Sequence, residues 1–129
     1  MKRVLLIAAL SAAGFLFWTS THSAAPPAEK VLRHVVLFKF KEGTPAKDVD
    51  AVVKAFGALP SKISEVHAYE WGTDVSPEKL SKGLTHCFQL TFKTEAGRDV
   101  YLKHAAHTEF VGLLKPILDD ATVVDYWTN

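Results

Sequence analysis

Apolar positions alternate with other positions in two stretches of the chain that resemble each other. RHVVLFKF occupies residues 33–40 and THCFQLTF occupies residues 85–92, and both are rich in β-branched and aromatic residues. This two-residue period is typical of strands. Each predicted strand has a histidine near its start, His34 in the first and His86 in the second. The apolar residues on the same predicted faces as these histidines are Val36, Phe38, Phe40, Phe88, Leu90 and Phe92.

A helical period follows the first of these strands. In residues 42–59, Thr44 is the predicted N-cap and Pro45 the first helical residue. Apolar residues then recur at helical spacing until the break at Pro60. We therefore predict an amphipathic helix between the first strand and the next.

A longer helical region, residues 95–120, follows the strand that contains His86, and Thr94 is its predicted N-cap. Gly97, Gly112 and Pro116 lie inside this region. Because glycine and proline weaken or break helices, we do not expect one straight helix here.

Two further strands complete the pattern, at residues 64–73 and 121–128, and the polar segment 74–83 connects the second strand to the third. The resulting order is βαββαβ. It predicts an α+β, ferredoxin-like domain in which an antiparallel sheet has helices on one face only. The opposite face would expose Val35 and Leu37. We therefore expect a homodimer that packs sheet against sheet.

His34 and His86 lie 52 residues apart, which is the offset between the two βαβ halves. A histidine on an apolar strand face has to be paired, because burying an unpaired polar group is costly. We therefore predict that the two histidines face one shared pocket beneath the helices.

The first 24 residues have the plan of a secretory signal peptide. Lys2 and Arg3 precede a 15-residue apolar run at residues 4–18, and small and polar residues follow it. This run is shorter than the roughly 20 residues that span a bilayer, so we expect cleavage and no stable membrane anchor. Residues 25–30 read as a linker. The mature protein is then exported, to the periplasm or the medium.

Charge and composition exclude several function classes for the predicted mature protein. Without Lys2 and Arg3 it has 13 basic and 14 acidic residues. Such a balance, with the lysines interspersed among acids, does not favour nucleic acid as a partner. Cys87 is the single cysteine, so an intramolecular disulfide is impossible. The histidine spacing matches no zinc motif, and we expect neither a metal nor a cofactor.

Five segments in order carry a family likeness: RHVVLFKFKEGTP, EWGTDVS, THCFQLTF, RDVYLKHAAHTEFV and VVDYW. Together they resemble the stress-responsive A/B barrel (Dabb) domain family. The resemblance spans about residues 31–127, and we assign residues 31–129 to this domain. It implies a dimeric α+β barrel, which agrees with the fold that the hydrophobic pattern predicts.

The chain also resembles, more distantly, olivetolic acid cyclase, a plant member of this family that folds a linear polyketide by aldol condensation. The catalytic positions of its Tyr-x-x-His-x-x-His motif match Tyr101 and His107, and its pocket-lining strand histidines match His34 and His86. The motif here reads HAAH where the family more usually has His-Pro-Ala-His, so Ala105 stands in place of a proline.

Three functions remain open from the sequence. The first is a pocket between sheet and helices for a small apolar or aromatic molecule. The second is a cyclase, lyase or isomerase in which His107 is the general base and Tyr101 its partner, since imidazole accepts protons near neutral pH. The third is a non-catalytic structural stress protein. The predicted ligand-binding residues are His34, Val36, Phe38, His86, Phe88 and His104.

Overall fold

The computed structural model describes residues 29–129. The predicted signal peptide, residues 1–24, lies outside the described residues, as does the linker up to residue 28. The elements in chain order are β1 (Leu32–Phe40), α1 (Ala46–Gly57), α2 (Leu59–Lys62), β2 (Ala68–Thr73), β3 (His86–Phe92), α3 (Glu95–Lys103), α4 (Ala105–Leu114) and β4 (Leu118–Trp127).

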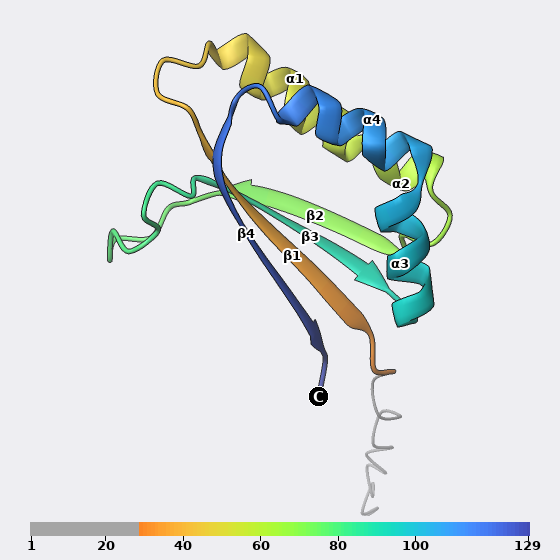
Figure 1. Cartoon of the computed structure of the whole chain (residues 1–129). Helices are drawn as coiled ribbons and strands as arrows, with labels where there is room; N and C mark the ends of the chain where they lie inside the picture. Colours follow the sequence, from red (N-terminus) through yellow and green to blue (C-terminus); the bar gives the residue numbers. More distant parts are fainter. Residues whose placement is uncertain (1–28) are drawn as a thin grey trace, which may run out of the picture.

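The four strands form one sheet in the order β2-β3-β1-β4, and each neighbouring pair is antiparallel. The helices all lie on one face of this sheet, and β4 is the edge strand beside β1 (Figure 1). The prediction of an α+β, ferredoxin-like fold is therefore confirmed. Strand ends differ from the predicted ones by a few residues, because sheet pairing and not local pattern decides where a strand begins.

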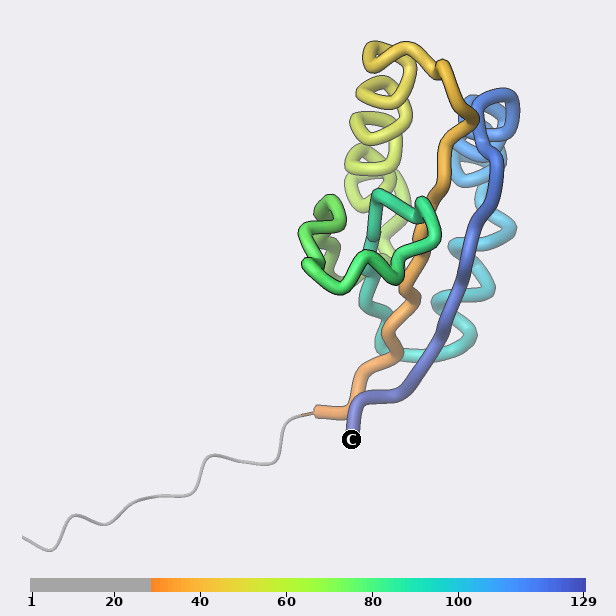
Figure 2. Tube along the Cα trace, turned by 90° about the vertical axis from the view of Figure 1, so that its left-hand side faces the viewer, coloured from red at the N-terminus to blue at the C-terminus, as the bar shows by residue number. Residues whose placement is uncertain are grey.

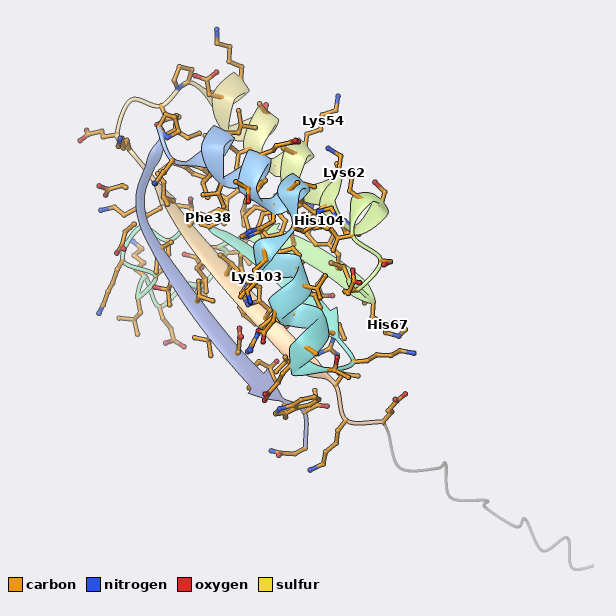
Figure 3. The ribbon with its side chains drawn as sticks, turned by 45° about the vertical axis from the view of Figure 1, so that its right-hand side comes forward. Phe38, Lys54, Lys62, His67, Lys103 and His104 are labelled. Carbon is orange, nitrogen blue, oxygen red and sulfur yellow. The ribbon has the colours of Figure 1, made fainter. Side chains whose placement is uncertain are left out.

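An aromatic core fixes the helices to the centre of the sheet. The rings of Phe56 on α1 and Phe88 on β3 stack with centroids 4.3 Å apart, and Phe110 on α4 meets Phe56 edge-on at 4.7 Å. Phe38 on β1 lies beneath α4 (Figure 3) and is 3% exposed. Burying an aromatic side chain of this size contributes about 1.5–3 kcal/mol to folding. The predicted inward face of β1 is confirmed.

The predicted start of the first helix was wrong by one position. Pro45 is the N-cap of α1 and its side chain makes no capping bond, so Pro45 is not the first helical residue. Thr44 does not cap the helix either, because its hydroxyl donates to the carbonyl of Lys41 at 2.6 Å. The Thr44 hydroxyl is therefore part of the turn at residues 41–44, which precedes the helix, and is not available to cap it.

The second helical region is two helices that meet at His104, which lies at their junction in Figure 3. Thr94 caps α3, as predicted, by accepting a bond from Gly97 N. The interruption is neither at Gly97 nor at Gly112. His104 adopts an extended conformation (ψ 141°), ends α3, and accepts a bond from Ala106 N through its own Nδ1, which caps α4.

The sheet face opposite the helices is open in the single chain. Val35 and Leu37 are half-buried there, and Val124 and Tyr126 are 50% and 46% exposed. The connection between β2 and β3, residues 74–85, stands off the sheet (Figure 2). Within residues 29–129, no helix has the length and apolar character needed to cross a membrane.

Ala105 is the first residue of α4, a position at which proline fits a helix because its N–H has no helical partner. His104, before it, already has the extended backbone that precedes proline. We therefore expect Ala105→Pro to raise the free energy of unfolding by about 0.4–1 kcal/mol. Chemical denaturation measures this change. The matched control is Ala106→Pro. This substitution removes the backbone N–H that donates to His104 Nδ1 at the start of α4, so we expect it to destabilise the protein. Equal stability of the two variants would contradict this view of the junction.

Candidate functional site

A pocket of about 470 Å³ lies between the helices and the inner face of β1 and β4. It exists because the helices pack over the centre of the sheet and leave β4 largely uncovered, so that Val123 on its inner face is 56% exposed. Ten of the fifteen lining residues are apolar. The polar ones are His34, Arg98, Tyr101, His107 and Asp125.

The backbone register of β1 and β4 places Asp125 directly opposite His34. Residues opposite each other in an antiparallel pair point to the same sheet face. His34 Nδ1 lies 2.6 Å from Asp125 Oδ1. The other carboxylate oxygen, Oδ2, accepts a bond from Arg98 Nη1 at 2.8 Å, and Arg98 also pairs with Asp99 on α3. A strand histidine, a strand carboxylate and a helix guanidinium thus form one connected network.

Burial of the Asp125 carboxyl raises its pKa, but the hydrogen bonds from His34 and Arg98 outweigh that effect, and the pKa is lowered. The carboxylate is therefore ionised at neutral pH and only accepts hydrogen bonds. It follows that the shared proton lies on His34 Nδ1, and that Nε2 is left for other partners.

Tyr101 lies against both pocket histidines. Its ring centroid is 5.8 Å from that of His34 and 4.6 Å from that of His107. The break at His104 makes the second contact possible, because Tyr101 is on α3 and His107 is on α4. We call His34, Tyr101 and His107 the pocket row.

His107 Nδ1 lies 3.2 Å from the carbonyl oxygen of Leu102. A carbonyl oxygen only accepts hydrogen bonds, so the proton of the neutral imidazole lies on Nδ1. Nε2 is then the nitrogen that can accept a hydrogen bond or a proton. Burial lowers the pKa of His107 and the nearby His34 lowers it further, whereas the bond to Leu102 acts in the opposite direction. His107 is therefore neutral at pH 7, as a general base has to be.

The polar ends of the pocket row have no other partner among residues 29–129. The structure gives no hydrogen bond to His34 Nε2, His107 Nε2 or the Tyr101 hydroxyl in that range. These three polar atoms are also not fully buried. Among residues 29–129, the fully buried side-chain polar atom that has no hydrogen-bond partner is the Tyr69 hydroxyl. Burial raises the pKa of Tyr101, so its phenol stays protonated and is available as a donor.

The predicted shared pocket for His34 and His86 was wrong. The register pairs His34 with Leu90 and His86 with Phe38, so His86 lies four residues further along β1, about 13 Å away. The His86 ring meets Phe40 edge-on at 5.1 Å and stacks near Trp71 at 6.3 Å. The two halves of the fold are related by an approximate two-fold axis, which sends equivalent residues to opposite ends of an antiparallel pair.

Other predicted ligand-binding residues divide in the same way. Val36 and Phe38 line the pocket together with His34. Phe88 does not line it, because its ring is packed in the core against Phe56. His104 does not line it either, since its imidazole caps α4. The predicted catalytic pair, Tyr101 and His107, does meet in the pocket; whether these residues act on a ligand stays a prediction.

Sequence reasoning missed Arg98 and Asp125 as members of the site. Asp125 interrupts the apolar run TVVDYW on a face that otherwise points inward, and a lone carboxylate there signals a partner. Arg98 carried no such signal, because its role depends on how α3 lies over β4. Within residues 29–129, no three histidine, cysteine, aspartate or glutamate side chains converge in a group that suits a metal ion.

The fold and the pocket define a ferredoxin-like α+β protein in which two histidines and a tyrosine line a pocket beside the edge strand β4. Residues 32–128 match the family described as Stress responsive A/B Barrel Domain, so the chain belongs to this family. The stress-response A/B barrel protein HS1 of Arabidopsis thaliana is 36% identical over 95 residues, which cover 74% of this chain and 87% of HS1. The predicted family is therefore confirmed.

Two similar proteins are named for enzymatic activities. Hydroxynitrile lyase from Passiflora edulis is 26% identical with a TM-score of 0.73, and the match covers 79% of this chain and 96% of that one. Olivetolic acid cyclase of Cannabis sativa is 24% identical over 95 residues, or 74% of this chain and 94% of the cyclase. The predicted distant relationship to this cyclase is confirmed.

A solved structure from Thermobifida fusca, described as a dimeric ferredoxin-like protein, has a TM-score of 0.66 at 23% identity. The match covers 77% of this chain and 92% of that one. At this identity the likeness supports the fold.

The lowered pKa of His107 predicts a pH dependence with a definite sign. The unfolded chain has a histidine pKa near 6.5, and the folded value lies below it. As pH falls below 6.5 the unfolded state takes up the proton first, so the His107 contribution to stability is lost on acidification. NMR titration of the His107 ring should give a midpoint below 6.5. A midpoint at or above 6.5 would contradict the neutral, base-competent imidazole; exposed His67 serves as the internal reference.

Proposed function

We propose that this chain binds a small, neutral, mostly apolar molecule in the pocket and transfers a proton to or from a carbon next to its carbonyl group. The observation that carries this proposal is the pocket row, in which three side-chain polar atoms without other partners lie along an apolar pocket. Unpaired polar groups at a concave apolar site are the features that orient a ligand.

The charges of the pocket favour a neutral ligand. Arg98 is the cation and Asp125 the anion among the lining residues, and the two pair with each other at 2.8 Å. A second carboxylate, that of Asp99, also neutralises Arg98. A charged ligand would find no free counter-charge to offset the loss of its hydration. A ligand with one carbonyl or hydroxyl group matches the three polar atoms and the apolar wall.

The geometry supports catalysis as well as binding. His107 is neutral, and its Nε2 is free to accept a proton. The Tyr101 ring lies 4.6 Å from the His107 ring, and its phenol can donate a hydrogen bond to the ligand's oxygen. Removal of a proton next to a carbonyl is the step shared by cyclases, many lyases and isomerases. The name of the Cannabis protein, a cyclase, supports an assignment to this reaction class. The Passiflora protein is named a hydroxynitrile lyase, and cleavage of a hydroxynitrile also needs a group that accepts a proton, in that case from a hydroxyl.

A homodimer formed through the open sheet face is part of the proposal. Val124 and Tyr126 are exposed there beside half-buried Val35 and Leu37, and a monomer would leave this apolar surface in water. The Thermobifida fusca protein of the same fold is described as dimeric. Packing of the two sheets would complete the barrel for which the family is named.

Export is proposed from the sequence of residues 1–24, with its basic start and apolar run. An extracytoplasmic compartment is oxidising, and a chain whose single cysteine is Cys87 needs no disulfide to fold there. The subunit mass of the protein after export tests this proposal, because cleavage near residue 24 removes the segment that contains Lys2 and Arg3.

Deuterium exchange tests the acid–base function directly. Phenylacetone is neutral and aromatic, and its carbonyl acidifies the neighbouring C–H bonds. The wild-type protein should accelerate the uptake of deuterium from D₂O at these positions, as followed by NMR. His107→Gln should slow this uptake by about 100-fold, which is the usual size of a general-base contribution.

The matched control is His67→Gln, which replaces an exposed histidine that points away from the pocket near the start of β2 (Figure 3). It should leave the exchange rate unchanged. If wild-type protein and His107→Gln exchange phenylacetone at the same rate, His107 is not the base. If phenylacetone binds without exchange, the pocket is a binding site and the enzymatic part of the proposal fails.

A further inference from the structure

The two pocket histidines differ in what holds the Nδ1 proton. His107 donates to the uncharged carbonyl of Leu102, whereas His34 donates to the ionised carboxylate of Asp125 at 2.6 Å. When His34 Nε2 carries a second proton, the Asp125 charge is already in place to balance it. His107 has no carboxylate in hydrogen-bond contact, and its pKa is lowered by burial and by His34. Groups whose environments differ in this way take opposite roles in proton transfer.

Asp125 is held so firmly that its orientation is fixed. The β1–β4 register sets its backbone opposite His34, and Arg98 Nη1 holds the carboxylate oxygen that His34 does not use. Arg98 is itself held, because its Nε and Nη2 both donate to Asp99 Oδ1. Both oxygens of Asp125 are therefore engaged, and the imidazole of His34 keeps a proton on Nδ1, which leaves Nε2 as the nitrogen available to a ligand.

His34 is buried, with 5% of its surface exposed. The rings of His34 and His107 both pack against the ring of Tyr101. A ligand oxygen that bonds to the Tyr101 hydroxyl would therefore lie beside a side chain whose ring contacts both imidazoles.

We infer that His34 is the proton donor of the pocket, acting across the Tyr101 ring from His107, and that Asp125, held by Arg98, is its positioning residue. This inference rests on the proposed acid–base function and assigns the second proton-transfer group that such a reaction needs.

For a ketone the step balances as follows. His107 Nε2 takes a proton from the carbon beside the carbonyl, and the C–H electron pair becomes a carbon–carbon double bond. The π pair of the carbonyl moves to oxygen, which takes the Nε2 proton of a doubly protonated His34 and becomes an enol hydroxyl. His34 is then neutral and keeps its Nδ1 proton, which it donates to Asp125. Reversal of the step with a solvent deuteron returns the labelled ketone, so no further reactant is consumed.

Phenylacetone exchange in D₂O, measured on the full set of variants, tests the donor. We expect His34→Gln to slow exchange by at least ten-fold. Asp125→Asn should do the same, since an amide in place of the carboxylate carries no charge to balance the doubly protonated His34 that donates from Nε2. The matched control is Asp119→Asn, which makes the same change on β4 at a carboxylate that pairs with Lys39 and does not line the pocket, and it should stay within two-fold of wild type. Thermal melting of each variant confirms that it is folded.

The outcomes separate this inference from the function on which it rests. If His107→Gln loses exchange while His34→Gln and Asp125→Asn keep the wild-type rate, the function stands and the donor assignment is overturned. If wild-type protein does not exchange phenylacetone, the proposed function fails and the inference fails with it.

The tautomer provides a readout that does not depend on turnover. The ¹⁵N spectrum of the histidine rings, recorded at a pH where His34 has lost its second proton, should show the remaining His34 proton on Nδ1 in wild-type protein, and on Nε2 in Asp125→Asn. A wild-type His34 with its proton on Nε2, or a tautomer that Asp125→Asn leaves unchanged, would overturn the positioning role. His67 gives the reference signal of an exposed histidine in the same spectrum.

Discussion

A histidine on the buried face of a central strand has to be paired, and this requirement shapes much of the structure around it. His34 lies among aromatic neighbours, with Tyr101 and Phe92 against its ring. An unpaired imidazole nitrogen in that place would cost on the order of 1–3 kcal/mol. Asp125 supplies the partner, and it can do so only if β4 pairs with β1 in the observed register. A slip of one residue would turn the carboxylate to the opposite face of the sheet.

The same pairing explains why there is a pocket on this side of the sheet. Asp125 and its neighbour Arg98 form a polar edge that α3 reaches from above, while the aromatic core around Phe56 and Phe88 holds the helices over the other strands. The inner face of β4 is left uncovered between these two attachments. A concave, mostly apolar space with a polar row along one side results.

The fold was predictable because several independent signals agreed. Alternation marked the strands, helical spacing marked the helices, and the βαββαβ order then left one common topology. Part of the candidate site was predictable on the same basis, together with the family resemblance. Five of the eight predicted site residues line the pocket: His34, Val36, Phe38, Tyr101 and His107.

The errors lie where the three-dimensional arrangement decides what a residue does. For the two strand histidines, similarity between the halves of the sequence did not reveal how the halves are placed in space. His34 and His86 are equivalent in the two halves, yet the antiparallel pairing places them at opposite ends of β1 and β3. His104 has the spacing of a site residue, but the helix break needed a cap and its imidazole serves there. Arg98 was missed because nothing local reveals that its guanidinium reaches across to a strand 27 residues later in the chain.

The central claim is that this fold, as a dimer, holds a ligand in the pocket beside His34, Tyr101 and His107. Native mass spectrometry of residues 25–129 tests it most directly, because one spectrum gives the number of subunits and any bound mass. The account predicts a dimer that carries a discrete small molecule, or that takes up phenylacetone when this ketone is added. A monomer, or a dimer that stays bare in the presence of phenylacetone, would contradict it.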